Sequence, residues 1–133
     1  MEEPASKTSE VRKPKMEPMI TLKTLAQASE QEVFDQVATY LLKQGMRSSD
    51  KSGNCKYRHE GLRCAAGCLI GDDEYDPSME VNSWDRLTAT SKAPKDHADL
   101  IVSLQAIHDD CNPLDWKGHL KVLAVNSNLK WNL

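Results

Sequence analysis

Three segments with helical spacing of apolar residues constrain the fold of this chain most. The first follows Ser29-Glu-Gln-Glu32, the pattern of a capping box, in which each end residue accepts a hydrogen bond from the other's backbone N–H. Gly45 is placed to end the helix. The sequence therefore predicts an amphipathic helix over 30–44 that packs through one apolar face. That face consists of Val33, Phe34, Val37, Ala38, Leu41 and Leu42.

The second and third segments lie in the C-terminal part of the chain. A helix is predicted over 95–110, after Pro94, and its apolar face is made of His97, Leu100, Ile101, Leu104, Ile107, His108 and Cys111. Asn112 and Pro113 suit the cap and first position of another helix. Its buried stripe is Trp116, Leu120, Leu123 and Ala124, and Leu129 and Trp131 are expected to hold the C-terminus down.

Three of the four cysteines fall in one short segment, over 54–70. Residues 55–58 are expected to pair with those after Gly61 as a short β-hairpin that is stable only when packed on helices. Residues 64–70 fit either a second strand or a short helix, and a buried helical turn is the favoured prediction there. A further short helix is expected over 79–87. The fold class predicted is α+β: a small helix-dominated domain with about three main helices and a short β-hairpin or irregular Cys-rich insertion.

Composition bounds the domain organisation. The chain has 133 residues, of which 39% are hydrophobic and 5% aromatic, so one domain with a mainly aliphatic core is expected over 19–133. Residues 1–18 hold three prolines and balanced charges with little apolar content, which predicts a disordered charged tail. The alternative for that tail is a peptide that becomes ordered on a partner.

Charge and hydropathy exclude some classes of function. The formal net charge is −3, which argues against a dedicated nucleic-acid binder. The chain lacks an apolar run long enough for a membrane span or a signal peptide, so a cytoplasmic protein with reduced thiols is expected.

The cysteine segment contains residue types that bind zinc in proteins. The candidate ligands are Cys55, His59, Cys64 and Cys68. Thiolates and imidazole suit zinc, but the intervals of three, four and three residues differ from the usual two-residue knuckle. Buried, reduced thiols without a cofactor are the favoured prediction, with a zinc-stabilised structural or adaptor module as the alternative and a disulfide as a third option.

A cysteine-dependent enzyme is a further alternative. It would pair a nucleophilic thiol with an imidazole base that a carboxylate orients. The candidates are Cys64 or Cys68, His97 or His108, and Asp109 or Asp110. Since no nucleophile-elbow motif accompanies them, we expect no catalytic residue and a protein that is not an enzyme.

Seven residues are the candidates for binding a partner protein. Tyr57, Arg58, Arg63 and Trp84 are of types enriched at interface hot spots, and Asp72, Asp73 and Glu74 form an acidic turn. A calcium loop starting at Asp72 is excluded, because Pro77 stands where glycine is needed and Ser83 where a bidentate glutamate is needed.

The segment Cys55-x-Tyr-Arg58, followed by Gly61-Leu-x-Cys-Ala-Ala-Gly-Cys-Leu-Ile70 and later Ile107-His-Asp109, resembles small uncharacterised proteins of bacteria and their tailed phages. The resemblance covers about residues 22–131 and brings no activity with it. It implies a small cytosolic accessory protein of phage or mobile-element type that binds and modulates a host protein. Inhibition of a defence or nucleic-acid enzyme is one form this takes. The oligomeric state and the partner's identity stay open.

Overall fold

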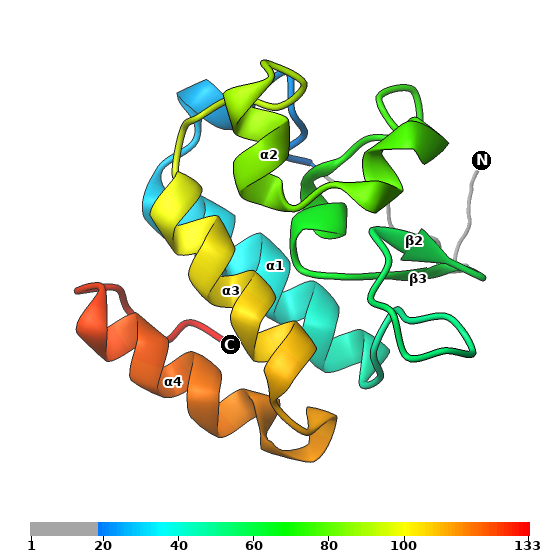
Figure 1. Ribbon diagram of the computed structural model, residues 1–133. Coiled ribbons are helices and arrows are strands. Elements are labelled where there is room, and N and C mark those ends of the chain that lie inside the picture. Colours follow the sequence, from blue (N-terminus) through cyan, green and yellow to red (C-terminus); the bar gives the residue numbers. More distant parts are fainter. Residues whose placement is uncertain (1–18) are drawn as a thin grey trace, which may run out of the picture.

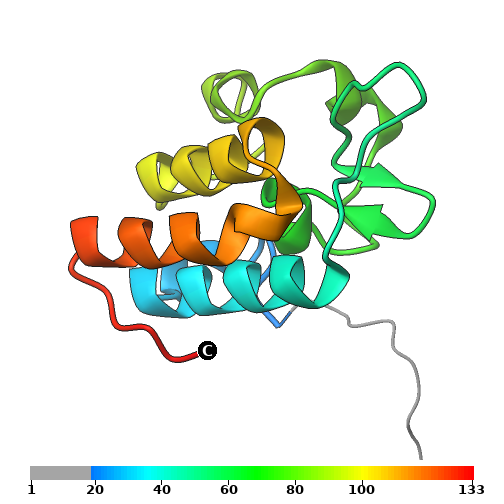
Figure 2. The same ribbon diagram turned by 90° about the horizontal axis from the view of Figure 1, so that it is seen from below.

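Three helices lie side by side in the computed structural model, which describes residues 19–133; the tail predicted over 1–18 lies outside the described residues. They are α1 (Glu30–Gln44), α3 (Ala98–Asp110) and α4 (Trp116–Asn126), and each contacts the other two. Figures 1 and 2 show the β-hairpin and its loops gathered at one end of this helical layer. The predicted α+β class, with three main helices and a short hairpin, is confirmed.

α1 forms as its sequence predicts. The Ser29 hydroxyl accepts a hydrogen bond from the Glu32 N–H at 3.1 Å, and the Glu32 carboxylate accepts one from the Ser29 N–H at 2.9 Å. Gly45 ends the helix with a φ of 70°, a left-handed conformation that favours glycine. The apolar face, from Val33 to Leu41, is buried against the other helices.

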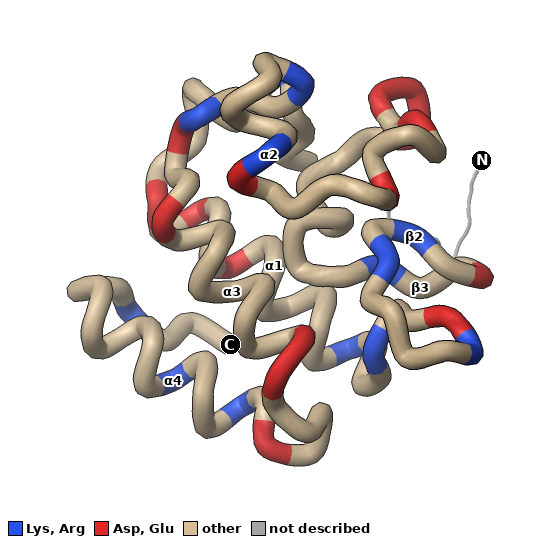
Figure 3. The backbone as a smooth tube through the Cα atoms, in the orientation of Figure 1, with Lys and Arg blue, Asp and Glu red and all other residues tan. Residues whose placement is uncertain are grey.

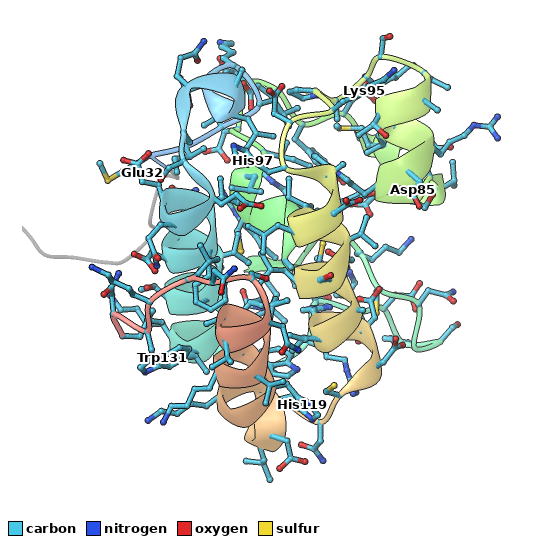
Figure 4. The ribbon with its side chains drawn as sticks, turned by 90° about the vertical axis from the view of Figure 1, so that its left-hand side faces the viewer. Glu32, Asp85, Lys95, His97, His119 and Trp131 are labelled. Carbon is cyan, nitrogen blue, oxygen red and sulfur yellow. The ribbon has the colours of Figure 1, made fainter. Side chains whose placement is uncertain are left out.

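α3 begins three residues later than predicted, at Ala98. His97, expected on the buried helical face, has a φ of 60°, and this left-handed residue interrupts the right-handed helical path. The His97 side chain instead meets the carbonyl oxygen of Ala28 at 2.8 Å. Figure 4 shows His97 between the starts of α1 and α3, so this contact joins the two helices near their N-terminal ends.

α4 also begins later than the cap at Asn112 suggested. Residues Pro113–Asp115 form a 3-10 turn, η4, in which the Asp115 N–H donates to the Asn112 carbonyl at 2.8 Å. The Asn112 side chain caps this turn by accepting a hydrogen bond from the Leu114 N–H at 2.9 Å. α4 then starts at Trp116, whose fully buried ring donates its indole N–H to the carbonyl of Cys111 at 3.2 Å.

The C-terminal residues return to α1, as expected. The Trp131 ring meets the Phe34 ring edge-on, with centroids 6.2 Å apart. The side-chain amide of Gln31 bonds both the N–H and the carbonyl of Lys130, at 2.8 and 2.9 Å. Figure 4 shows Trp131 beside α1 and α4. These contacts fix the end of the chain over the helical core.

The predicted hairpin is confirmed, but it is very short and its first strand lies at Arg58–His59 rather than over 55–58. Strands β2 (Arg58–His59) and β3 (Leu62–Arg63) are antiparallel, with Arg58 opposite Arg63. Glu60 and Gly61 make the turn with φ values of 50° and 83°, the pattern of a two-residue turn that matches strand twist. Because two residues per strand give little stability alone, the hairpin depends on the elements beneath it.

One of those elements is the buried 3-10 turn η2 (Ala66–Leu69), which confirms the helical turn predicted after Cys64. Gly67 brings η2 against the backbone of Tyr57, just before the hairpin. A Cβ atom on Gly67 would lie 2.2 Å from the Tyr57 carbonyl oxygen, closer than any real contact. Glycine at this position therefore allows the hairpin to pack on the core.

The helix predicted over 79–87 is two separate elements. These are a 3-10 helix η3 (Pro77–Val81) and α2 (Trp84–Ala89). Ser83 has extended backbone angles, and its hydroxyl accepts a hydrogen bond from the Arg86 N–H at 3.2 Å, so it caps a new helix.

In the part of the chain that the structure describes, no helix has both the length and the apolar character that a membrane crossing requires.

Candidate functional site

A cleft of about 350 Å³ opens where the loop before the hairpin, η3, the start of α2 and the second half of α3 meet. Two of the predicted partner-binding residues, Tyr57 and Trp84, belong to its walls. Its other lining residues are Cys55, Lys56, Cys64, Glu80, Asn82, Ser83, Asp85, Val102, Gln105, Ala106, Asp109 and Asp110. The cleft combines residues from segments that are far apart in the sequence.

Glu80 fixes one wall of the cleft. Its carboxylate accepts hydrogen bonds from the backbone N–H groups of Tyr57 and Arg58, at 2.8 and 3.1 Å. It also accepts one from the Tyr75 hydroxyl at 2.5 Å, and burial together with this bond raises the pKa of Tyr75 to about 12. The Tyr57 hydroxyl donates to the carbonyl of Asn82 at 2.7 Å. Glu80 is therefore a structural bridge between the hairpin and η3.

Asp109 forms the opposite wall, within a chain of hydrogen bonds. The imidazole of His108 is fully buried, and its Nε2 lies 3.0 Å from the N–H of Ser48. A backbone N–H can only donate, so Nε2 accepts, and Nδ1 carries the proton that it donates to the Asp109 carboxylate at 2.8 Å. Gln105 donates to the same carboxylate oxygen at 2.9 Å. These contacts define a neutral His108 in one tautomer.

Cys55 completes this cluster. Although burial opposes it, hydrogen bonds from His108 and Cys55 lower the pKa of Asp109 below its ordinary value. Ligand atoms of Cys55, His108 and Asp109 lie within 4.8 Å of one another, which makes them the one group of three in the described residues with metal-binding proximity. Of the four zinc ligands proposed from sequence, this group contains Cys55 alone.

The other three proposed ligands are engaged elsewhere. His59 lies on the hairpin, with its Nε2 3.8 Å from the Glu60 carboxylate. Cys64 and Cys68 are buried, and the Cys68 thiol donates to the Cys64 carbonyl at 3.2 Å. Sequence reasoning named His108 and Asp109 as candidates for an imidazole base and its carboxylate, but it did not place them beside Cys55, because that proximity depends on tertiary packing.

The hydrogen bonds of His108 disfavour metal binding and catalysis in this arrangement. A metal at Nδ1 would displace the proton there, while Nε2 still accepts from Ser48, and a neutral imidazole does not offer both nitrogens as acceptors. A catalytic base needs a free nitrogen to take a thiol proton, and Nε2 is occupied. Asp109 orients His108, as the cysteine-enzyme alternative required. Within the described residues, however, His108 forms no hydrogen bond with either candidate nucleophile, Cys64 or Cys68.

The thiols are not activated. Burial, followed by the hydrogen bond to Asp109, raises the pKa of Cys55 to about 12. Burial also raises the pKa of Cys64 to about 12 and that of Cys68 well above its ordinary value. Since the thiolate is the nucleophile, the raised pKa values of these three thiols argue against a nucleophilic role at neutral pH.

Two predicted partner-binding arginines hold the hairpin to the acidic turn. Arg58 and Arg63 both donate to the Asp72 carboxylate, at 2.7 and 3.1 Å. Arg58 also lies over the Tyr75 ring, 5.0 Å from its centroid, and Arg63 over the Tyr40 ring at 5.8 Å. Arg63 is 7% exposed. The predicted role of these residues in partner binding stays a prediction, and the contacts described give them a structural one.

The other two acids of the turn hold the segment before α1. Glu74 accepts hydrogen bonds from the N–H groups of Leu22, Lys23 and Gly71 at 2.8 to 3.0 Å. Asp73 pairs with the Lys23 ammonium at 2.7 Å on the surface. Asp73 therefore forms an exposed ion pair, whereas Glu74 fixes the backbone of residues 22, 23 and 71.

Trp84 lines the cleft and has an unpaired donor. The residue is 3% exposed, and its buried indole Nε1 has no hydrogen-bond partner among the described residues. Leaving such a donor unpaired costs about 1–3 kcal/mol, and because the nitrogen is buried, a ligand in the cleft does not reach it in this conformation.

Two lining carboxylates, Asp85 and Asp110, are exposed and form no hydrogen bond or ion pair with the described residues. Asp85 lies on the first turn of α2, away from α1 and α4 (Figure 4), and Asp110 ends α3. Figure 3 shows the acidic positions of α2 and those at the end of α3 on separate stretches of the backbone. The sequence did not single out Asp85, because its position beside the cleft depends on tertiary packing.

Comparison with known proteins gives no family, curated relative or solved structure that matches this chain.

Proposed function

We propose that this protein is a small binding module that engages another protein through the face containing the cleft. The observation that carries this proposal is the open cleft itself, with unpaired carboxylates at Asp85 and Asp110 beside a rigid wall. Val81 adds an apolar side chain that is 88% exposed, next to the lining residue Asn82. Apolar area together with unpaired polar groups is typical of protein-binding surfaces.

Rigidity supports binding rather than catalysis as the function of this face. The walls are fixed by Glu80 and Asp109, whose carboxylates accept hydrogen bonds from backbone and side-chain donors. A prearranged surface loses little conformational entropy when a partner binds. Raised thiol pKa values at Cys55 and Cys64 argue against a cysteine nucleophile at the same place.

The biological setting rests on the resemblance to small proteins of bacteria and their tailed phages. From it we propose a cytoplasmic accessory protein that modulates, and in one form inhibits, a bacterial protein. The comparisons with known proteins neither support nor oppose this setting.

The test uses a variant that fills the cleft without a change of charge. Ala106 lines the cleft and is exposed on α3, so Ala106→Trp occludes the cleft with little cost to the core. The matched control is Val125→Trp, because Val125 is 74% exposed on α4 and lines no part of the cleft. Tyr57→Ala and Arg58→Ala are unsuitable, since both residues stabilise the hairpin.

Tagged wild-type and variant proteins are used to capture partners from bacterial lysate, after circular dichroism shows that all are folded. We expect a specific protein retained by the wild type and by Val125→Trp, and lost with Ala106→Trp. Equal retention by Ala106→Trp would place the interface elsewhere and reject this face.

A zinc-stabilised module is the second candidate, because Cys55, His108 and Asp109 lie close enough to share an ion. Zinc binding there requires Ser48 to release His108. Purified protein with about one zinc per chain, and a melting temperature that falls with a chelator, would favour this candidate. Metal-free protein with a melting temperature that a chelator does not change would reject it.

A further inference from the structure

The charges at the cleft select the kind of partner. Its lining contains four carboxylates and one lysine, and Lys56 is already 3.8 Å from the Asp50 carboxylate. Glu80 and Asp109 are committed to internal hydrogen bonds. The uncompensated charge therefore lies at Asp85 and Asp110, which attracts a cationic ligand and repels an anionic one.

A protein partner has the groups that match this charge. The proposed function makes the partner a protein, and arginine and lysine side chains carry guanidinium and ammonium groups that pair with carboxylates. The Trp84 side chain lines the same cleft, but its indole Nε1 is buried and is not a contact for this ligand.

We infer that the cleft binds a basic segment of the partner protein. Its positive side chains pair with Asp85 and Asp110, on the cleft that the Trp84 side chain also lines. This inference rests on the proposed function and names the chemistry of the segment recognised. Because the two free acids belong to different helices, the segment carries more than one basic residue.

Charge also disfavours a second copy of this chain that docks through α4. α4 exposes Val122 and Val125, with Lys117 and Lys121 on the same helix and no carboxylate between 116 and 126. A two-fold α4 contact would bring these lysines together, which like-charge repulsion opposes. Docking of α4 into the cleft of another copy is an outcome that the experiment detects.

The experiment uses blocked peptides of equal length that contain two arginines, two lysines or two glutamates, titrated into the full-length protein labelled with ¹⁵N. Peptide concentrations up to about 10 mM detect dissociation constants in the millimolar range. The indole N–H signal of Trp84, assigned by its loss in Trp84→Phe, reports on the cleft. The indole signals of Trp116 and Trp131 are internal references.

We expect the arginine or lysine peptide to shift the Trp84 signal, with an effect that weakens at high salt, and the glutamate peptide to leave it unchanged. The double variant Asp85→Asn, Asp110→Asn should weaken basic-peptide binding by roughly fivefold or more. The control Glu30→Gln, Asp96→Asn makes the same charge change at exposed acids that line no part of the cleft, and should change affinity by less than about twofold.

The inference is overturned if no basic peptide moves the Trp84 signal, or if the two double variants weaken binding equally. If Ala106→Trp nevertheless abolishes partner capture, the proposed function stands, but the inference that the partner binds through a basic segment is wrong. A mass that rises with protein concentration, together with a Trp84 shift in the absence of peptide, identifies a second copy as the occupant and likewise overturns the inference.

Discussion

Replacement of Gly67 by alanine should destabilise the protein strongly. An added Cβ atom would lie 2.2 Å from the Tyr57 carbonyl oxygen and 3.0 Å from the carbonyl carbon, both of them backbone atoms. Ordinary contact requires about 1 Å more separation from the oxygen. The backbone of Tyr57 or of η2 therefore has to move.

The cost follows from what holds Tyr57 in place. Its N–H donates to the Glu80 carboxylate at 2.8 Å, and its hydroxyl donates to the Asn82 carbonyl at 2.7 Å. A hydrogen bond to a charged group contributes about 1.5–3 kcal/mol and a neutral one about 0.5–1.5 kcal/mol. Loss of both, or equivalent strain in η2, gives a destabilisation of about 2–4 kcal/mol.

Gly118→Ala is the matched control. Gly118 lies within α4, and nothing lies within 4 Å of an added Cβ atom, so alanine should stabilise by about 0.5–1 kcal/mol through helix propensity. Urea unfolding followed by circular dichroism measures the free energy of unfolding of each variant. A loss below about 1 kcal/mol for Gly67→Ala would show that the hairpin does not pack on η2 as described.

Three further predictions concern the cleft walls. Glu80→Gln should lower the free energy of unfolding, measured by urea unfolding, by about 2–3 kcal/mol, because a single amide oxygen would replace a carboxylate that accepts three hydrogen bonds. Iodoacetamide at pH 8 should alkylate Cys55 at least about a hundredfold more slowly in native than in unfolded protein, as peptide mapping would show; equal rates would contradict the raised pKa. The lowered pKa of Asp109 stabilises the fold above the ordinary carboxyl value of 3.8, and this stabilisation is lost as pH falls through the folded pKa. Unfolding free energies measured from pH 5 to 2 should therefore fall less steeply for Asp109→Asn than for wild type, and parallel profiles would exclude this contribution.

Helix positions were predictable because their causes are local. The capping box at Ser29 and the left-handed Gly45 depend on neighbouring residues alone, and both were read from the sequence. The start of α3 was misplaced because the left-handed conformation of His97 is stabilised by a contact with Ala28, far away in the chain. The spacing of apolar residues along the chain does not indicate a contact between residues that are distant in sequence.

The site was less predictable than the fold for the same reason. Tyr57 and Trp84 were proposed from residue type as partner-binding residues; both line the cleft, and their role in binding stays a prediction. Residue type could not show that Arg63 would be buried and paired with Asp72, or that Asp110 would be left free. These outcomes depend on how the hairpin, α2 and α3 meet.

Hydrogen–deuterium exchange of the protein in complex with its captured partner tests the central claim most directly. The account predicts slower exchange at residues 55–57, 80–85 and 102–110, which surround the cleft, with α4 unchanged. Protection confined to α4, with the cleft residues exchanging as in the free protein, would contradict it.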